Sequence, residues 1–199
     1  MMKMSPGNHS SAGAGHTPKG TAIIQARTGS TRLPGKALME MGGKPMLWYA
    51  IRTLQLSPAV RRVVVAVPDT PGDRVLLDLA ADVGAAAFTG SEQNVLERFY
   101  LASRAFPDAS YFRATGDNPI LDTLTPERSL NYLIENRLDY ACESKLPVGC
   151  VSEVFTAAAL AKSYREGKTP EDIEHVTWYI KKSGKFRIAY FPGPSHLQY

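Results

Sequence analysis

A basic, glycine-bearing stretch near the N-terminus carries the residues best suited to chemistry. Three cationic side chains, Arg27, Arg32 and Lys36, follow one another closely, and Gly29 lies between the first two. The apolar residues 21–24 that precede them are typical of a buried strand. Glycine lets backbone N–H groups approach an anion, and Arg or Lys neutralises it. The stretch therefore predicts a loop that binds nucleotide phosphates, and the alternative is a solvated basic loop.

Asp117 is the best candidate for a metal ligand in this chain. It follows the segment 110–115, which predicts a strand, with Gly116 between them. Magnesium in nucleotide sites takes one or two carboxylates, and water and substrate phosphates complete its shell. We therefore expect Asp117 to bind Mg²⁺ beside the phosphates. The alternative is a turn-forming Asp before Asn118 and Pro119.

Strands and helices alternate along the first part of the chain. The patterns predict strands at 21–24, 61–67, 85–88 and 110–115, and helices at 45–56, 71–83 and 92–106. This alternation favours an α/β fold with a mainly parallel, doubly wound sheet. Ligands of such sheets bind beyond the carboxyl ends of the strands. The basic loop, the turn at 89–91 and Asp117 should therefore share one site.

The second part of the chain has a looser pattern. It predicts helices at 126–136, 157–166 and 173–181, strands at 139–143 and 186–191, and an extended segment at 148–155. We expect a disordered tail at 1–20 and one domain at 21–199. Within it, residues 21–122 form a nucleotide-binding half, and residues 123–199 form a half for acceptor binding and dimerisation.

Composition sets limits on the class of protein. Hydrophobic residues make up 44% and charged residues 21%, which is ordinary for a soluble globule. The sequence has no apolar run of membrane-span length, and its N-terminus lacks the apolar region of a secretory signal. The two cysteines form no disulfide or metal framework. We expect a cytoplasmic protein that binds neither membrane nor nucleic acid, because its net charge of +4 comes without a basic face interleaved with aromatic residues.

Several motifs resemble one known family. They are Gln25-Ala26-Arg27, Gly29-Ser30-Thr31-Arg32-Leu33-Pro34-Gly35-Lys36, Gly43-Lys44-Pro45-Met46-Leu47, Val95-Leu96-Glu97-Arg98-Phe99-Tyr100, Gly116-Asp117-Asn118-Pro119, Glu153-Val154-Phe155 and Glu174-His175-Val176-Thr177. Together they are similar to the cytidylyltransferases that make CMP-sugars. The similarity is greatest to the branch of spore coat polysaccharide biosynthesis, and acylneuraminate and deoxy-octulosonate cytidylyltransferases resemble the chain more distantly. The resemblance implies a nucleotide-diphospho-sugar transferase-like, Rossmann-like fold.

The resemblance also implies an activity and a set of site residues. The expected reaction transfers CMP from CTP to a sugar or sugar acid for surface polysaccharide biosynthesis and releases pyrophosphate. Mg²⁺ on Asp117 would be the cofactor, and the expected assembly is a homodimer. Arg27, Arg32 and Lys36 are the candidate catalytic residues, and Glu153 and His175 are candidates for the acceptor, with a structural role as the alternative. The candidate nucleotide-binding residues are Gln25, Ala26, Arg27, Gly29, Ser30, Arg32, Lys36, Gly90 and Ser91.

Two departures from the family pattern keep other functions open. Val151 stands where the family usually has an Asp, two residues before Glu153. The sequence also stops at Tyr199, before a segment in which the family usually carries a further acid and a last helix. Three hypotheses therefore remain: an active cytidylyltransferase, a nucleotide-binding protein of this fold without turnover, and a sugar-phosphate nucleotidyltransferase that uses another nucleoside triphosphate.

Overall fold

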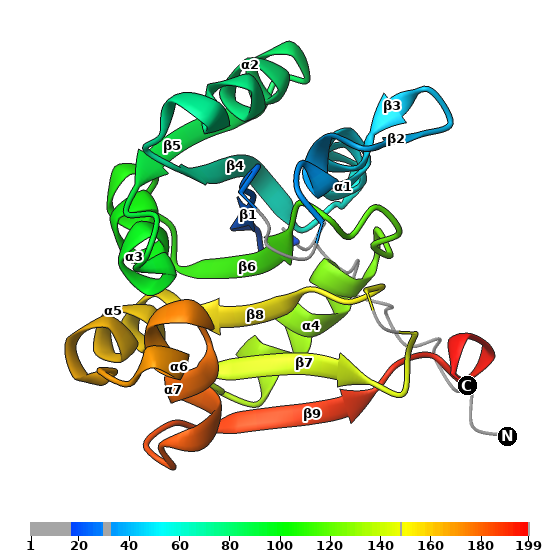
Figure 1. Cartoon of the computed structure of the whole chain (residues 1–199). Helices are drawn as coiled ribbons and strands as arrows, with labels where there is room; N and C mark the ends of the chain where they lie inside the picture. The colour runs from blue at the N-terminus through cyan, green and yellow to red at the C-terminus, as the bar shows by residue number, and fades with distance from the viewer. Residues whose placement is uncertain (1–16, 30–32, 148, 199) are drawn as a thin grey trace, which may run out of the picture.

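A seven-stranded sheet forms the centre of the molecule (Figure 1). The computed structural model describes residues 17–29, 33–147 and 149–198. The strand order is β5-β4-β1-β6-β8-β7-β9. The strands are β1 (Gly20–Gln25), β4 (Val60–Pro68), β5 (Ala86–Gly90), β6 (Ser110–Thr115), β7 (Tyr140–Ser144), β8 (Glu153–Thr156) and β9 (Ile188–Pro192).

Strand direction divides this sheet into two parts. The first four strands in the order, β5, β4, β1 and β6, are all parallel. Strand β8 runs antiparallel to both of its neighbours, β6 and β7, and β9 is parallel to β7. The structure therefore confirms an α/β fold with a mainly parallel sheet, and both predicted halves contribute strands to it.

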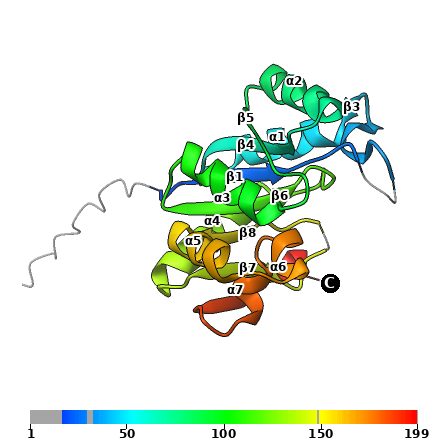
Figure 2. The same cartoon turned by 60° about the vertical axis from the view of Figure 1, so that its left-hand side comes forward.

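Helices cover both faces of the sheet (Figure 2). One face packs against α1 (Met46–Leu56), α2 (Arg74–Asp82) and α4 (Thr125–Glu135). The other packs against α3 (Val95–Ala105), α5 (Ala157–Glu166) and α7 (Trp178–Lys182), and α6 (Pro170–Glu174) lies against α3 and α7. None of the helices in the described residues is long and apolar enough to cross a membrane.

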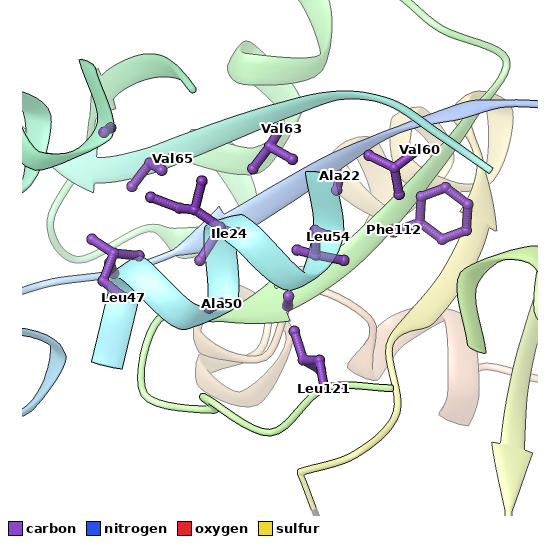
Figure 3. Close-up of a cluster of buried hydrophobic side chains, with 14 of the residues drawn as sticks. Ala22, Ile24, Leu47, Ala50, Leu54, Val60, Val63, Val65, Phe112 and Leu121 are labelled. Atoms are coloured by element: carbon purple, nitrogen blue, oxygen red, sulfur yellow. The ribbon is translucent and has the colours of Figure 1, made fainter. Parts of the chain in front are cut away.

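The central strands are apolar on both sides because both of their faces are covered. In β1, Ala22 and Ile24 point into one layer and Ile23 points into the other. Figure 3 shows Ile24 lying over Leu47 and Ala50 of α1. A fully buried aliphatic side chain stabilises a fold by about 1.5–3 kcal/mol. Burial of these alternating residues therefore holds β1 in the middle of the sheet.

The prediction of one continuous helix at 173–181 is wrong, because the structure has two short helices there. Helix α6 ends at Glu174, α7 begins at Trp178, and His175 has the non-helical angles φ −109° and ψ 70°. A capping box between Thr169 and Asp172 starts α6 earlier than expected. The chain then turns before α7, and this turn brings His175 to the cleft described below and Thr177 to Glu153.

Several further details differ from the sequence-based expectation. Helix α3 begins at Val95, not at Glu92, because the Asn94 side chain accepts the Glu97 N–H and caps it. A short hairpin of β2 (Glu40–Met41) and β3 (Lys44–Pro45) was not predicted. The expected tail at 1–20 lies outside the described residues up to position 16, and Gly20 already belongs to β1.

Candidate active site

A cleft of about 880 Å³ lies beyond the carboxyl ends of β1 and β6. It brings residues of the first predicted half together with the α6 segment of the second. Its lining consists of Gln25, Ala26, Arg27, Lys36, Ala37, Glu92, Gln93, Val95, Arg98, Thr115, Gly116, Asp117, Pro170, Ile173, Glu174 and His175. This is the edge at which the alternating pattern predicts a ligand.

The floor of the cleft requires a residue without a side chain at position 116. The Gly116 N–H donates to the Gln25 carbonyl at 2.9 Å, which continues the contact between β6 and β1. A Cβ at this position would lie 2.9 Å from the Ala26 Cβ and 3.2 Å from a Leu47 methyl. Glycine therefore allows the loop that carries Asp117 to pass directly over the end of β1.

Lys36 and Asp117 form an ion pair in the cleft, with 3.0 Å between Nζ and Oδ2. Burial alone would raise the pKa of Asp117, but hydrogen bonds from Lys36 and Thr115 outweigh it and hold that pKa below its ordinary value. The carboxylate is therefore ionised at neutral pH. The structure thus brings together the predicted phosphate-binding lysine and the predicted metal ligand, 81 residues apart in sequence.

Asp117 fits a magnesium ion that arrives with a nucleotide. The described residues contain no group of three or more His, Cys, Asp or Glu side chains that could hold a metal by themselves. A single ionised carboxylate, 41% exposed, is enough where substrate phosphates and water supply the other oxygens. The site therefore suits a metal–nucleotide complex and not a protein-only metal cage.

The basic loop is anchored from below by Asp73, a buried acid of the 3₁₀ turn Pro71–Asp73. Its carboxylate accepts the Thr28 N–H at 2.6 Å and the Thr28 hydroxyl at 2.9 Å. It also accepts the Thr70 hydroxyl at 2.6 Å. These bonds hold the backbone next to Arg27, which lines the cleft.

The predicted loop residues are covered in part by the structure. Gly29 is described, and a Cβ there would meet nothing within 4 Å. Ser30 and Arg32 lie outside the described residues, so their predicted roles stay predictions. At the far end of the loop, the Gly35 N–H donates to the Thr28 carbonyl at 2.8 Å, with Gly35 at φ 71°, where glycine is favoured.

Arg98 is a cleft residue that the site prediction missed. It lies on α3 with 2% of its surface exposed, and its Nη1 donates to the Ser91 carbonyl. Its Nε has no hydrogen-bond partner within the described part of the chain. Burial and the neighbouring charge of Arg27 lower the pKa of the Arg98 guanidinium to about 10. Two arginines thus face one cleft, an arrangement that favours a bound anion.

Arg98 also explains where Gly90 and Ser91 lie. A Cβ on Gly90 would come within 3.1 Å of the Arg98 Cγ, so this glycine packs beneath the arginine. The Ser91 hydroxyl accepts the Asn94 N–H at 3.0 Å, and its carbonyl accepts from Arg98. Neither residue is part of the cleft lining, which Glu92 and Gln93 continue at this edge. The apolar pattern of α3 hides Arg98, because the residue occupies a position that faces the core.

The two candidate acceptor residues have different environments. His175 lines the cleft, together with Pro170, Ile173 and Glu174. Glu153 does not line it, and its carboxylate accepts hydrogen bonds from Arg113 and Lys181, both at 2.8 Å. Burial alone would raise the pKa of Glu153, but the charges of Arg113 and Lys181 outweigh it and lower that pKa to about 2. The structure therefore brings His175 to the predicted site and leaves Glu153 beneath it.

Fold and cleft together define a class of protein. The α/β sheet with two helical layers matches solved nucleotide-diphospho-sugar transferase-like folds. A cytidylyltransferase from Leptospira borgpetersenii is 27% identical with a TM-score of 0.82, and the match covers 89% of this chain and 77% of that one. A CMP:2-keto-3-deoxy-manno-octonic acid synthetase, solved in complex with CTP, shares the fold at 18% identity and a TM-score of 0.69, with 88% and 90% of the two chains covered.

Sequence comparison gives the family. The model of the cytidylyltransferase family matches residues 21–191, and the chain belongs to this family. An uncharacterized protein of Methanocaldococcus jannaschii is 36% identical over 177 residues, which are 88% of this chain and 73% of the relative. The spore coat polysaccharide biosynthesis protein SpsF of Bacillus subtilis is 31% identical over 182 residues, or 88% and 76%. These findings confirm the resemblance inferred from the motifs.

Proposed function

We propose that this protein transfers CMP from CTP to a sugar or sugar acid and releases pyrophosphate. The observation that carries the proposal is the Lys36–Asp117 pair in a cleft that Arg27 and Arg98 also line. A triphosphate needs cationic groups around its oxygens and a carboxylate for its metal ion. The cleft, at about 880 Å³, is within the size range of small-molecule sites and draws residues from both halves of the chain.

The chemistry assigns a role to each part of the cleft. An acceptor oxygen attacks the α-phosphorus of CTP, a new P–O bond forms, and the bond to the departing pyrophosphate breaks. Arg27 and Lys36 neutralise the phosphate oxygens and keep the triphosphate in line for attack, and Arg32, whose role is predicted from the sequence, assists them. His175 is our candidate to accept the proton of the attacking hydroxyl, because it lines the cleft and a neutral imidazole has a nitrogen that can accept a proton. Asp117 would hold Mg²⁺, which supplies further charge neutralisation at the phosphates.

The names of the relatives support a sugar as the acceptor. SpsF is a spore coat polysaccharide biosynthesis protein. Several 3-deoxy-manno-octulosonate cytidylyltransferases also match, for example that of Trichlorobacter lovleyi at 30% identity over 58% of this chain. On this basis we propose a sugar or sugar acid destined for surface polysaccharide as the second substrate.

One observation favours a second candidate, a nucleotide-binding protein without turnover. Val151 packs against an apolar cluster where the family resemblance leads us to expect an acid. The nearby Glu153 is fully engaged by Arg113 and Lys181. If catalysis needs a second carboxylate at this point, the chain would bind CTP and not react.

A nucleotide panel followed by a turnover assay separates these candidates. The melting temperature is measured with CTP, UTP, ATP and GTP, each with and without Mg²⁺, because a ligand that binds only the native state raises it. We expect CTP with Mg²⁺ to give the largest shift, and pyrophosphate release to appear with one member of a sugar and sugar-acid panel. Equal shifts with every nucleotide would remove the cytidine assignment. A CTP-specific shift without pyrophosphate release across the panel would favour the second candidate.

A further inference from the structure

One face of the sheet changes from apolar to polar as it approaches the cleft. Tyr111 and Phe155 pair across β6 and β8 and are buried in the core. The next pair toward the cleft is Arg113 and Glu153. On β1, the buried Ile23 is likewise followed on the same face by Gln25, which lines the cleft. A polar layer of three adjacent strands therefore lies directly under the site.

Arg113 joins the members of this layer. Its Nε donates to Oε1 of Gln25 at 3.0 Å, and its Nη1 donates to Oε2 of Glu153 at 2.8 Å. Glu153 is in turn held by Lys181 at 2.8 Å and by the hydroxyls of Tyr140 and Thr177. The guanidinium cannot move without breaking bonds to two side chains, so its Nε–H points to Gln25 in a fixed direction.

This arrangement determines which part of the Gln25 amide faces the ligand. An arginine Nε–H only donates, so the glutamine atom that meets it must be the carbonyl oxygen. The amide nitrogen, with two N–H donors, is left on the other side, and no partner for it is found among the described residues. A reversed amide would place two donors against each other. The Gln25 side chain therefore presents its hydrogen-bond donors to the cleft, while its oxygen is turned toward Arg113.

We propose that Gln25 is a specificity-determining residue that recognises a hydrogen-bond acceptor of the bound substrate, and that Arg113 and Glu153 are its positioning residues. The inference rests on the proposed function, because it assigns a role within the same cleft. The recognised atom is an oxygen or nitrogen lone pair, and it belongs either to the nucleotide or to the second substrate. Arg113 and Lys181 outnumber Glu153 in charge, so the layer as a whole favours an electron-rich group above it.

The same carboxylate also holds the opposite wall of the cleft. Thr177 donates to both oxygens of Glu153 at 3.1 and 3.0 Å, and it lies two residues after His175. Lys181 of the following helix α7 binds Glu153 as well. Glu153 therefore links two sides of the cleft. Through Arg113 it fixes the position of Gln25, and through Thr177 it fixes the segment that carries His175.

The test compares three variants of the full chain. Gln25→Glu keeps the acceptor for Arg113 and removes both donors, and Gln25→Met removes the donors without adding charge. Gln55→Glu makes the same change on α1, outside the cleft lining, as the control. In the first arm, the Kd of CTP with Mg²⁺ is measured by calorimetry. In the second, the CTP complex is titrated with 3-deoxy-manno-octulosonate and with N-acetylneuraminate as sugar-acid probes.

We expect both Gln25 variants to weaken binding in one of the two arms by about tenfold, since losing the donor to a bound polar group costs about that much. A change in the first arm assigns the acceptor atom to CTP, and a change in the second arm alone assigns it to the sugar acid. If the Gln25 variants bind CTP and the sugar acids as tightly as the wild type and the control do, the inference is overturned. Wild-type protein that binds no CTP would instead contradict the proposed function, and the inference with it.

A double variant tests whether Arg113 acts through Gln25. Arg113→Lys keeps the charge but replaces the planar fork, in which Nε and Nη1 bond to Gln25 and Glu153, with a single ammonium nitrogen. If its role is to orient the amide, Gln25→Met should add nothing to the affinity loss already caused by Arg113→Lys. Additive losses would mean that Arg113 supports the fold and does not position Gln25, which overturns that part of the inference.

Discussion

At the scale of single residues, Lys36 forms an ion pair with Asp117, the carboxylate that we propose as the magnesium ligand. Both side chains are about two-fifths exposed, at 38% and 41%. An exposed ion pair contributes only about 0–1 kcal/mol to stability. The pair keeps the Asp117 carboxylate ionised. Breaking it, so that Lys36 can bind a phosphate, should cost the protein little stability. This gives Asp117 a role that is separable from folding.

Asp117→Asn keeps the size of the side chain and removes its charge. We expect the free energy of unfolding to change by less than about 1 kcal/mol. The tightening of CTP binding by Mg²⁺ should disappear, and pyrophosphate release should fall by orders of magnitude. Titration of CTP with and without Mg²⁺ measures the first effect.

Asp122→Asn is the matched control for this change. Asp122 accepts the Leu124 N–H at 2.9 Å and binds Arg128, and it does not line the cleft. Its loss should lower stability and leave the response to Mg²⁺ intact. A normal Mg²⁺ response in the Asp117 variant would show that Asp117 is only a turn residue.

Glu153 predicts a pH dependence with a definite sign. Its pKa falls from the ordinary value of 4.5 to about 2 in the folded protein. A lowered carboxyl pKa gives stability that is complete above the unfolded value and is lost as the pH falls toward the folded one. Glu153 should therefore contribute on the order of 3 kcal/mol near neutral pH, and this contribution should vanish between about pH 4.5 and pH 2.

Glu153→Gln tests this dependence by urea unfolding at several pH values. Near neutral pH the variant should be less stable by a few kcal/mol, because Arg113 and Lys181 lose their counter-charge. The difference from wild type should shrink as the pH approaches about 2. A difference that stays the same across this range would mean that Glu153 acts through packing and not through charge.

At the scale of elements, the 3₁₀ turn Pro71–Asp73 determines the position of the basic loop. Asp73 is 3% exposed and holds both the N–H and the hydroxyl of Thr28. The loop and the turn are 45 residues apart in sequence, so the loop depends on packing between β1 and the segment after β4. A loop that binds anions works best when its backbone is ordered before the ligand arrives.

Asp73→Ala should therefore affect stability and binding together. Loss of the carboxylate leaves the partly buried Thr28 N–H without its partner, which costs about 1–3 kcal/mol. We also expect weaker CTP binding, because the loop beside Arg27 loses its anchor. Thermal unfolding and CTP titration measure the two effects.

Thr70→Val provides the comparison for Asp73→Ala. It removes one donor to Asp73 and leaves both bonds to Thr28 in place. Its CTP affinity should equal that of wild type. Equal losses of affinity in the two variants would contradict the anchoring role of Asp73.

At the scale of the whole molecule, the sheet ends in the strand β9. Two aromatic residues of the second half, Phe191 and Tyr179, have partners inside the chain. The Phe191 ring stacks on Tyr132 with 4.1 Å between centroids, and the Tyr179 hydroxyl donates to Glu166. Tyr190 on β9 is 55% exposed and Trp178 is 37% exposed. These two residues place exposed aromatic surface on β9 and α7.

We keep the prediction of a homodimer and place it on this surface. Light scattering at micromolar concentration should give twice the chain mass of 21.7 kDa. Tyr190→Lys should shift the protein to a monomer. The melting temperature of the variant should stay near that of wild-type protein diluted until it is monomeric. A wild-type monomer at this concentration would end the prediction.

Much of the fold could be predicted because its elements are local patterns. Helix α5 was predicted with the bounds that the structure shows, since its apolar spacing and its Thr156 cap lie within one short segment. The strands β1, β4 and β6 were found for the same reason, because their central residues are mainly apolar and are buried on both faces of the sheet. The edge of the sheet at which ligands bind then follows from the parallel topology.

The details of the site depended on contacts between distant residues. Lys36 and Asp117 could each be proposed from their neighbours in sequence, yet their 3.0 Å contact joins segments 81 positions apart. Arg98 resembles any core-facing position of an amphipathic helix until α3 is packed beside Ser91. Gln25 shows its donors to the cleft only because Arg113 and Glu153 are brought beside it from two other strands. Sequence periodicity reports burial and element type, whereas the direction of a polar side chain is determined by partners that only the folded chain supplies.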